Sequence, residues 1–365
     1  MRVSTKKFRF LLPGAALVLA MILAACGSAS SNGGSSTTTS PLKIAFLMPC
    51  STCADRFEKQ DKPLFIQAVK ALDPSIQVIA NNAQGSSATQ LAQTEAALTN
   101  GANVIVISPL DSATGVAVVA KASPQHVPVV SYDGLLTGAP IDYYISFPNE
   151  TVGEMQGQYL LDHVKPGGTI VMINGSQDID PGREFKAGAH KILDPAFASG
   201  RLKRGFEADI EQFDPSKAQT AMEQALTKLN NKIDGVLVAN DGMAGGVIAA
   251  LTAQKLNGKV LVTGQDASDA GLQRILVGDQ TMTVYKAIKQ EATAAAKIAV
   301  DLAKGDRSAA NSLATTKVNN GAMDVPSVLL MPVVVTKQNI FSTVIPDGFT
   351  TRARICVGPA AAQCP

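Results

Sequence analysis

The stretch 236–251, VLVANDGMAGGVIAAL, decides the fold class. Its first four residues form an apolar run that predicts a buried strand, and a helix rich in Ala and Gly follows directly after Asn240 and Asp241. A strand that leads at once into a helix is the repeating unit of a parallel sheet. The two polar side chains also bear on function, because Asn or Asp at such a place either caps the helix or faces a ligand.

The same alternation of strand and helix repeats along the chain from Lys43 onward. The segments NVIVIS, DGVLVA and KVLVTG are almost continuously apolar, as strands are when both faces of their sheet are covered. About a dozen such strands are too many for one doubly wound sheet of ordinary domain size. We therefore expect an α/β protein with two doubly wound parallel-sheet lobes. We assign 42–146 and 286–322 to the first lobe, 147–285 and 323–355 to the second, and 356–365 to a tail.

The first residues predict export. MRVSTKKFRF is basic, and the apolar run that follows it ends in Leu23-Ala24-Ala25-Cys26, a pattern typical of a secretory signal peptide. The tetrapeptide resembles the bacterial lipobox, so we expect a lipoprotein signal peptide over 1–26 with Cys26 as the lipidated residue. An uncleaved membrane helix is the alternative, although Pro13-Gly14 interrupts the run and the run is short for a span of about 20 residues.

Residues 27–41 are rich in Gly, Ser and Thr and predict a disordered tether. The protein is therefore expected to be exported and lipid-anchored on the outer face of the cytoplasmic membrane, at the cell surface or in the periplasm. The net charge of +2 gives no electrostatic reason to expect nucleic acid. We expect a monomer.

Apart from Cys26, the chain has Cys50, Cys53, Cys356 and Cys364. An exported protein occupies an oxidising compartment, so local disulfides are expected, and the pairs nearest in sequence are 50–53 and 356–364. The sequence does not fix the connectivity. A redox motif or half of a zinc site is the alternative for the CxxC pair, but no second CxxC or HxxxH follows. We expect no metal and no cofactor.

Polar side chains collect where the predicted strands end. Asp133, Asn240, Asp266 and Lys286 each follow an apolar run, and ligands of open α/β sheets bind at the carboxyl ends of the strands. Helix capping is the alternative for any one acidic or amide residue, but it does not explain the cations at the same edge, which are Arg56, Arg183 and Lys286.

The chain carries no phosphate-binding or catalytic motif of the common kinds. Fixed donors and acceptors without a nucleophile and base suit a neutral polyhydroxy ligand, because each hydroxyl needs both. Aromatic faces cover the apolar side of a sugar ring, and Phe57 and Phe213 are the candidates. Core packing is the alternative for both.

Five segments together resemble a known family. They are RFEKQDKPLF (56–65), VVSYD (129–133), DYYISFPNETVGEMQG (142–157), NNKIDGVLVANDGMAGG (230–246) and TGQDASDAGLQRILVGDQTMTVYKAI (263–288). With them the chain resembles the substrate-binding lipoproteins of bacterial sugar ABC transporters, and more narrowly the xylose-binding group of the ribose/galactose-binding-like family. The resemblance implies the type I periplasmic binding protein fold, in which a three-segment hinge joins the lobes and a monosaccharide binds between them before delivery to a membrane permease.

The resemblance also implies the roles of individual residues. Asn240 is expected to contact the sugar while Asp241 serves the turn and the helix start. Phe213 stands where the xylose group has a Trp, and Asp180 and Arg183 lie in a loop that contacts sugar in related proteins. The full ligand-binding set expected is Arg56, Phe57, Asp133, Asp180, Arg183, Phe213, Asn240, Asp266 and Lys286.

Two departures from the family pattern concern specificity and the loop before Arg56. The xylose group usually has Arg after Tyr-Asp, whereas here Gly134 follows Asp133, so a charged donor is missing. We expect Arg183 to replace that donor from the other lobe. A Cys50–Cys53 disulfide is expected to stiffen the loop and to lower its ordering cost on binding.

Three alternatives to a sugar-transport component stay open. In the first, the ligand is another polyhydroxy compound, such as a signal furanoside or an inositol. In the second, the protein is a sensor that reports the sugar to a membrane receptor. In the third, it is an enzyme that uses Asp133 or Asp266 as a general base.

Overall fold

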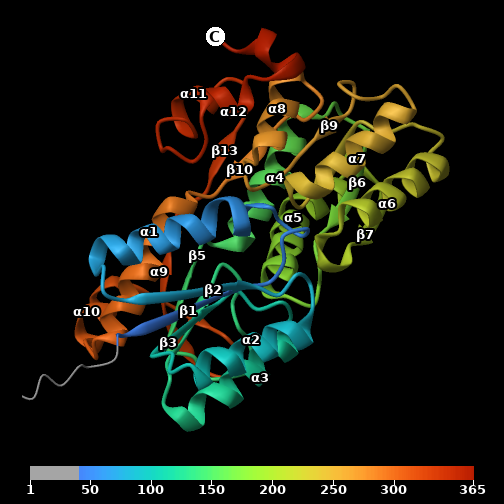
Figure 1. Ribbon diagram of the computed structural model, residues 1–365. Coiled ribbons are helices and arrows are strands. Elements are labelled where there is room, and N and C mark those ends of the chain that lie inside the picture. The colour runs from blue at the N-terminus through green and yellow to red at the C-terminus, as the bar shows by residue number, and fades with distance from the viewer. Residues whose placement is uncertain (1–40) are drawn as a thin grey trace, which may run out of the picture. The chain divides into compact units, whose positions relative to one another are not determined.

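The computed structural model of the chain describes residues 41–365 (Figure 1). The signal peptide expected over 1–26, with Cys26, and the tether expected over 27–41 except for its last residue lie outside the described residues. Within residues 41–365, none of the helices has both the length and the apolar character needed to cross a bilayer.

The first lobe is built on a seven-stranded sheet with the order β11-β12-β5-β4-β3-β1-β2. Its neighbouring strands are parallel except for β11 and β12. The strands are β1 (Lys43–Met48), β2 (Gln77–Asn82), β3 (Val104–Ile107), β4 (Val129–Tyr132), β5 (Tyr143–Ser146), β11 (Thr316–Asn319) and β12 (Asp324–Leu329). The central strands β3, β4 and β5 are buried along their whole length, which explains their uninterrupted apolar sequence.

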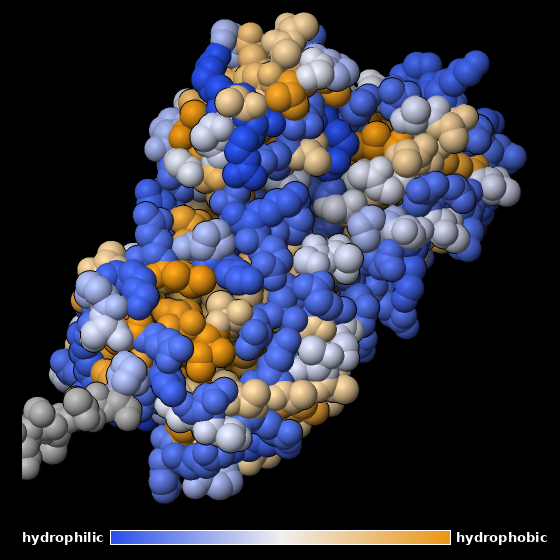
Figure 2. Space-filling model, in the orientation of Figure 1, coloured by the Kyte–Doolittle hydropathy of each residue, from blue (hydrophilic) through white to orange (hydrophobic). Residues whose placement is uncertain are grey.

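Helices cover both faces of this sheet. The helices α1 (Lys62–Leu72) and α9 (Ile288–Ala303) pack on one face and lie side by side (Figure 1), and α10 (Arg307–Leu313) packs against α9. The helices α2 (Ser87–Thr99) and α3 (Ser112–Ala122) pack on the other, and the short 3-10 turn η2 (Ser123–Gln125) extends α3. Figure 2 shows an apolar area between α1 and α2, where the edge strand β2 is only partly buried.

The second lobe is built on a four-stranded parallel sheet with the order β7-β6-β8-β9 and on the antiparallel pair β10-β13. These strands are β6 (Gly168–Asn174), β7 (Leu202–Asp209), β8 (Gly235–Val238), β9 (Leu261–Val262), β10 (Thr283–Tyr285) and β13 (Val333–Val335). Successive residues of β6 pack on opposite faces of the sheet. Met172 packs with α4 (Asn149–His163) and α5 (Asp180–Ala198), and Val171 packs with α6 (Pro215–Lys228) and α7 (Asp241–Ala253).

Glycines allow these helices to approach each other closely. A Cβ on Gly153 of α4 would lie 2.0 Å from the carbonyl oxygen of Phe185 in α5. A Cβ on Gly246 of α7 would lie 2.1 Å from the carbonyl oxygen of Pro215 in α6. Since real Cβ atoms do not approach a carbonyl so closely, Gly153 of α4 and Gly246 of α7 are packing requirements.

The chain passes between the two lobes after β5, after β10 and after β12. The expected boundary at residue 323 is wrong, because β12 hydrogen-bonds to β5 within the sheet of the first lobe, with Ser327 opposite Tyr144. The third crossing therefore occupies 330–332, and the second lobe resumes at β13.

The C-terminal residues fold against α8 (Asp269–Val277). They form α11 (Ile340–Thr343), α12 (Arg352–Ile355) and the 3-10 turn η4 (Gly358–Gln363). A disulfide joins Cys356 to Cys364, and Nη2 of Arg354 lies 2.6 Å from a carboxylate oxygen of Asp269 at the start of α8. The segment expected as a tail is thus packed onto the second lobe.

Candidate functional site

One cavity lies between the carboxyl ends of strands from both sheets, where ligands of open α/β sheets bind. From the first lobe it is lined by Pro49, Cys50, Cys53, Ala54, Arg56, Phe57, Ser108, Pro109, Leu110, Asp133 and Gly134. From the second lobe it is lined by Ser176, Ile179, Pro181, Phe185, Gln212, Phe213, Asn240, Gln265 and Asp266. Lys286, at the second crossing, completes the lining. The cavity contains every residue of the predicted set except Asp180 and Arg183.

Two buried cations contact one carboxylate in this cavity. Nη2 of Arg56 lies 3.0 Å from Oδ1 of Asp133, and Nζ of Lys286 donates a hydrogen bond of 2.5 Å to the same oxygen. Arg56 and Lys286 are only 2% and 1% exposed. Burial alone would raise the pKa of Asp133, but the two cations outweigh burial and lower this pKa below its ordinary value. Asp133 is therefore a partly enclosed, ionised acceptor whose side chain is 14% exposed.

Arg56 is supported by two more buried acidic side chains that do not line the cavity. Its Nη2 atom lies 3.1 Å from Oδ1 of Asp61 and 3.8 Å from Oε2 of Glu291. The hydroxyl of Tyr132 donates a hydrogen bond of 2.7 Å to Asp61. Burial raises the pKa of both Asp61 and Glu291, against the opposing charge of Arg56. These ion contacts lack hydrogen-bond geometry, so neither Nη atom of Arg56 has a hydrogen-bond partner within the described residues. The guanidinium is therefore held among carboxylates by charge rather than by aligned hydrogen bonds.

Asp266 adds a second carboxylate from the loop after β9. It is 6% exposed, its Oδ1 accepts a hydrogen bond of 3.2 Å from Gln265, and Nη1 of Arg56 lies 3.9 Å away. Burial raises the pKa of Asp266 to about 6, although Arg56 and Lys286 act in the other direction. The two carboxylates of the cavity therefore differ in how readily they take up a proton.

Three phenylalanine rings belong to the apolar part of the lining. The guanidinium carbon of Arg56 lies 4.9 Å from the ring centre of Phe57, and Nζ of Lys286 lies 5.9 Å from that of Phe185. The ring of Phe213 lies against the backbone of Gly175, where a Cβ would come within 2.2 Å of it. Rings beside fixed donors and acceptors provide the two kinds of contact that a polyhydroxylated ring requires.

The structure corrects the roles expected for Asn240 and Asp241. Asn240 is itself the helix cap, because its Oδ1 accepts the backbone N–H of Met243 at 2.9 Å, while its Nδ2 donates to the carbonyl of Cys53 at 3.0 Å. Asp241 is buried and accepts the N–H of Ser268 at 2.8 Å. Asp241 therefore fixes the loop that carries Asp266, and Asn240 combines capping with a place in the cavity wall.

The structure also places Asp180 and Arg183 outside the cavity lining. Asp180 begins α5, and Arg183 turns back to donate a hydrogen bond of 3.0 Å to the carbonyl of Gln177. The side chain of Arg183 is 39% exposed and lies 3.4 Å from Asp180. In this arrangement Arg183 does not supply the donor that is missing at Gly134.

Four residues in the cavity wall have backbone angles that side chains seldom adopt. They are Asp133 (φ 60°), Gln212 (φ 54°), Phe213 (φ 53°) and Asp266 (φ 93°). Left-handed backbone at non-glycine residues is uncommon and concentrates at functional sites, where the surrounding structure enforces it. This feature supports the cavity as the functional site independently of its polarity.

Several lining residues could not be recognised from the sequence. Gln212 and Gln265 each precede a predicted residue, Phe213 and Asp266, and this adjacency was the only available signal. Phe185 lies inside α5, where an apolar residue predicts core packing. Asp61 and Glu291, which support Arg56, also lie in helices, so their burial as charged groups was not visible in the sequence.

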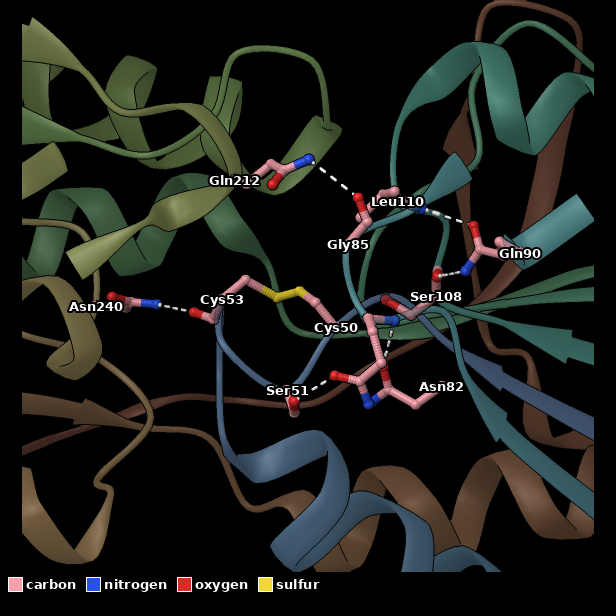
Figure 3. Close-up of a disulfide and its surroundings, with 11 residues drawn as sticks. Cys50, Ser51, Cys53, Asn82, Gly85, Gln90, Ser108, Leu110, Gln212 and Asn240 are labelled. Carbon is pink, nitrogen blue, oxygen red and sulfur yellow. Dashed lines mark hydrogen bonds between the residues drawn. A yellow bond between two sulfur atoms is a disulfide. The ribbon is translucent and has the colours of Figure 1, made fainter. Parts of the chain in front are cut away.

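The structure contains a disulfide between Cys50 and Cys53 (Figure 3). Both cysteines line the cavity, and they lie between the end of β1 and Arg56. The π-helical turn η1 (Phe57–Asp61) follows directly. The disulfide therefore closes the loop that delivers Arg56 and Phe57.

The chain forms two α/β lobes connected by three crossings, and a cavity of donors, acceptors and aromatic rings lies between them. This architecture defines a two-lobed solute-binding protein. The protein family model described as the periplasmic binding protein domain matches residues 44–307. The chain belongs to the periplasmic binding protein family.

Two relatives of the chain are named for the sugar that they bind. The chain is 43% identical over 295 residues to the D-xylose-binding periplasmic protein of Escherichia coli, an alignment that covers 81% of this chain and 87% of that protein. It is 40% identical over 301 residues to the D-xylose-binding periplasmic protein of Haemophilus influenzae, with 82% and 88% covered. Among solved structures it is similar to a carbohydrate transporter solute binding protein from Chloroflexus aurantiacus in complex with D-glucose, with a TM-score of 0.78 and 28% identity over 86% of this chain and 98% of that one.

These comparisons confirm three expectations. The resemblance to sugar-binding proteins of ABC transporters holds over most of the chain. The fold is the expected α/β type with two largely parallel sheets. The family consists of binding proteins rather than enzymes, which excludes the alternative in which Asp133 or Asp266 acts as a general base.

Proposed function

We propose that the protein is the extracytoplasmic solute-binding component of an ABC sugar importer and that it binds a monosaccharide, D-xylose or a related pentose, between its lobes. The observation that carries the proposal is the convergence of Arg56, Lys286, Asp133 and Asp266, all nearly or fully enclosed, on one cavity lined by phenylalanine rings. Relatives named as D-xylose-binding proteins share 40–43% of the sequence over about four-fifths of the chain.

In this proposal each polar group bonds to a sugar hydroxyl. The N–H groups of Arg56 donate, because they have no hydrogen-bond acceptor within residues 41–365. The carboxylates of Asp133 and Asp266 accept. Phe57 and Phe213 cover the C–H faces of the ring. The cations and carboxylates already hold each other in place, so little side-chain freedom is lost when the ligand enters.

An apolar corner of the cavity supports a pentose in particular. Gly134 lies between two prolines, with Pro181 3.6 Å and Pro109 3.7 Å from the position that its Cβ would occupy. Leu110 and Ile179 also line the cavity. A pentopyranose has a bare ring carbon where a hexopyranose carries a hydroxymethyl group. The bare carbon suits the apolar contacts that Pro181 and Pro109 provide, whereas a hydroxymethyl group buried against them would lose its hydrogen bonds to water.

The N-terminal sequence and the two-lobed fold support the other parts of the proposal. Acylation of Cys26 would anchor the protein to the outer face of the cytoplasmic membrane, and residues 27–41 would tether the folded part. Hinge closure around the sugar would bring the two lobes into one joint surface that the permease recognises. The ligand would then pass from the cavity into the transporter.

Calorimetric titration of the folded part, residues 41–365, with a panel of sugars tests the proposal. The panel contains D-xylose, L-arabinose, D-ribose, D-glucose, D-galactose and myo-inositol. We expect a pentose to bind with a Kd near or below 1 μM, which corresponds to about −8 kcal/mol. Absence of heat and of thermal stabilisation with every compound would reject the proposal. Tight binding of myo-inositol alone would replace the pentose with another polyhydroxy ligand.

A further inference from the structure

The loop closed by the Cys50–Cys53 disulfide contacts the opposite lobe as well as the cavity. The carbonyl oxygen of Cys53 accepts a hydrogen bond of 3.0 Å from Nδ2 of Asn240 (Figure 3). Both ends of this bond are fixed, because the disulfide holds the Cys53 peptide and the cap to Met243 holds the Asn240 side chain. The bond therefore connects two constrained groups of opposite lobes, both of which line the cavity.

A second hydrogen bond between the lobes lies close to the first. Nε2 of Gln212 donates to the carbonyl of Gly85 at 3.2 Å (Figure 3). The loop of Gly85 is itself bound to the disulfide loop, since the N–H of Gly85 donates to the carbonyl of Pro49 at 3.0 Å and the hydroxyl of Ser51 donates to Oε1 of Gln84 at 2.6 Å. The disulfide thus supports both acceptor carbonyls, one directly and one through the adjacent loop.

Gln212, the donor of the second bond, has an exposed side chain on a constrained backbone. Gln212 and Phe213 both lie in the left-handed region, in the short turn η3 (Glu211–Phe213). This turn directs Gln212 toward Gly85 and places the ring of Phe213 in the cavity wall. Such a backbone conformation is maintained only where neighbouring contacts enforce it. The bond from Gln212 and the ring contact of Phe213 are therefore parts of one local arrangement.

We propose that Gln212 and Asn240 form a latch that closes the cleft on the disulfide-bonded loop, and that this latch sets how long the ligand stays bound. The inference rests on the proposed function for its ligand. Gln212 and Asn240 act here as positioning residues, which hold the lobes together around the sugar. Since both latch bonds must break before the ligand can leave, their loss is expected to change the dissociation rate more than the association rate.

Two substitutions remove the latch bonds and keep the local structure. Asn240→Ser retains a good helix cap but no longer reaches the carbonyl of Cys53. Gln212→Asn retains a residue type that tolerates left-handed backbone but is too short to reach Gly85. Each is expected to increase the dissociation rate of bound radiolabelled D-xylose about 3- to 10-fold, with the association rate changed less than about 2-fold, because one neutral hydrogen bond is lost. Unchanged dissociation in both variants would overturn the proposal.

The cysteine pairs provide a matched comparison. The double change Cys50→Ser with Cys53→Ser removes the disulfide of the latch loop, and Cys356→Ser with Cys364→Ser removes the disulfide that packs on α8 and does not line the cavity. Only the double change at Cys50 and Cys53 is expected to increase the dissociation rate of the ligand. This increase should be smaller in the Asn240→Ser background than in wild type. Equal effects of the two cysteine pairs, or full additivity with Asn240→Ser, would contradict a latch on the disulfide loop.

A measurement on the sugar-free protein tests the latch separately from the proposed function. Small-angle X-ray scattering of the sugar-free proteins reports the average opening of the lobes. We expect a larger radius of gyration for Asn240→Ser and Gln212→Asn than for wild type. If no sugar binds wild type but the variants open, the proposed function fails and the latch stands. If sugar binds and the variants neither open nor release it faster, the latch fails alone.

Discussion

Lys286 and Asp133 are joined by a partly buried hydrogen bond of 2.5 Å although 153 residues separate them in the chain. Lys286 directly follows β10 at the second crossing between the lobes, and Asp133 directly follows β4 in the first lobe. The contact therefore connects the second crossing between the lobes to the cavity. The same carboxylate also receives Arg56, so a single acidic group organises both cations of the cavity.

The pair Lys286–Asp133 is expected to be energetically coupled. Lys286→Met removes the charge and keeps much of the volume, and we expect the free energy of unfolding to fall by about 1.5–3 kcal/mol, the range for a hydrogen bond to a charged group. Urea denaturation measures this change. In the double variant with Asp133→Asn, the loss should be smaller than the sum of the two single losses, because each change removes the same contact. Additive losses would show that the pair contributes no interaction of its own.

Asp266 is expected to make the stability of the sugar-free protein depend on pH. Its carboxyl has an ordinary pKa of 3.8 and a pKa of about 6 in the folded protein, because it is buried. The folded state thus retains a proton that the unfolded chain releases, so this contribution to stability is fully present below about pH 4 and is lost as the pH rises through about 6. The shift corresponds to roughly 3 kcal/mol at 1.36 kcal/mol per pKa unit.

Denaturation of wild type and Asp266→Asn at several pH values between 4 and 7 checks this expectation. The stability of wild type relative to the variant should fall across that range. Asp133→Asn is the control, because the pKa of Asp133 is lowered below 3.8 in the folded protein, so its contribution is lost only below about pH 4 and should stay nearly constant over this range. Parallel curves for wild type and Asp266→Asn would contradict the assignment.

Gly153→Ala is expected to disrupt the packing of α4 on α5. The new Cβ would lie 2.0 Å from the carbonyl oxygen of Phe185, so the helices must separate, at a cost of about 1–3 kcal/mol. Gly245→Ala in α7 is the matched control, because its Cβ would meet only the flexible end of Arg274 at 3.4 Å. There the lower entropy of alanine is expected to stabilise the protein by about 0.5–1 kcal/mol. Thermal unfolding distinguishes the two outcomes.

Gly134→Leu is expected to change selectivity without loss of the fold. The position has ordinary van der Waals space around it, between Pro181 and Pro109. A leucine there fills the corner that a hexose hydroxymethyl group would need, so we expect the ratio of D-xylose to D-glucose affinity to rise about 10-fold or more. Gly134→Ala should change this ratio less. An unchanged ratio in calorimetric titration would place the hydroxymethyl group elsewhere in the cavity.

The fold class and many of the cavity-lining residues could be predicted from the sequence, for a physical reason. Buried parallel strands need apolar side chains on both faces, so polar residues such as Asp133, Asp266 and Lys286 stand out where the strands end. Parallel strands also bring these ends to one edge of each sheet. Both rules depend on short segments of sequence, which is why they apply without knowledge of the contacts.

Other features depend on contacts that no local pattern reports. The sequence does not distinguish which of Asn240 and Asp241 caps the helix, because the answer depends on the distant partners Cys53 and Ser268. It does not reveal that Glu291 supports Arg56, because a glutamate on a helix is usually solvated. The end of the first lobe was misplaced because the pairing of β12 with β5 joins segments far apart in the chain.

The unusual backbone at Asp133, Gln212, Phe213 and Asp266 has a consequence for protein engineering. Glycine adopts these angles without steric conflict. At Gln212, whose side chain is exposed, glycine would relieve the strain without leaving a cavity or an unpaired charge, so a search for heat-resistant variants should recover glycine there. At Asp133 and Phe213 the same change would remove a buried ion pair or a buried ring, so thermal robustness cannot be gained at those two positions by relaxing the backbone.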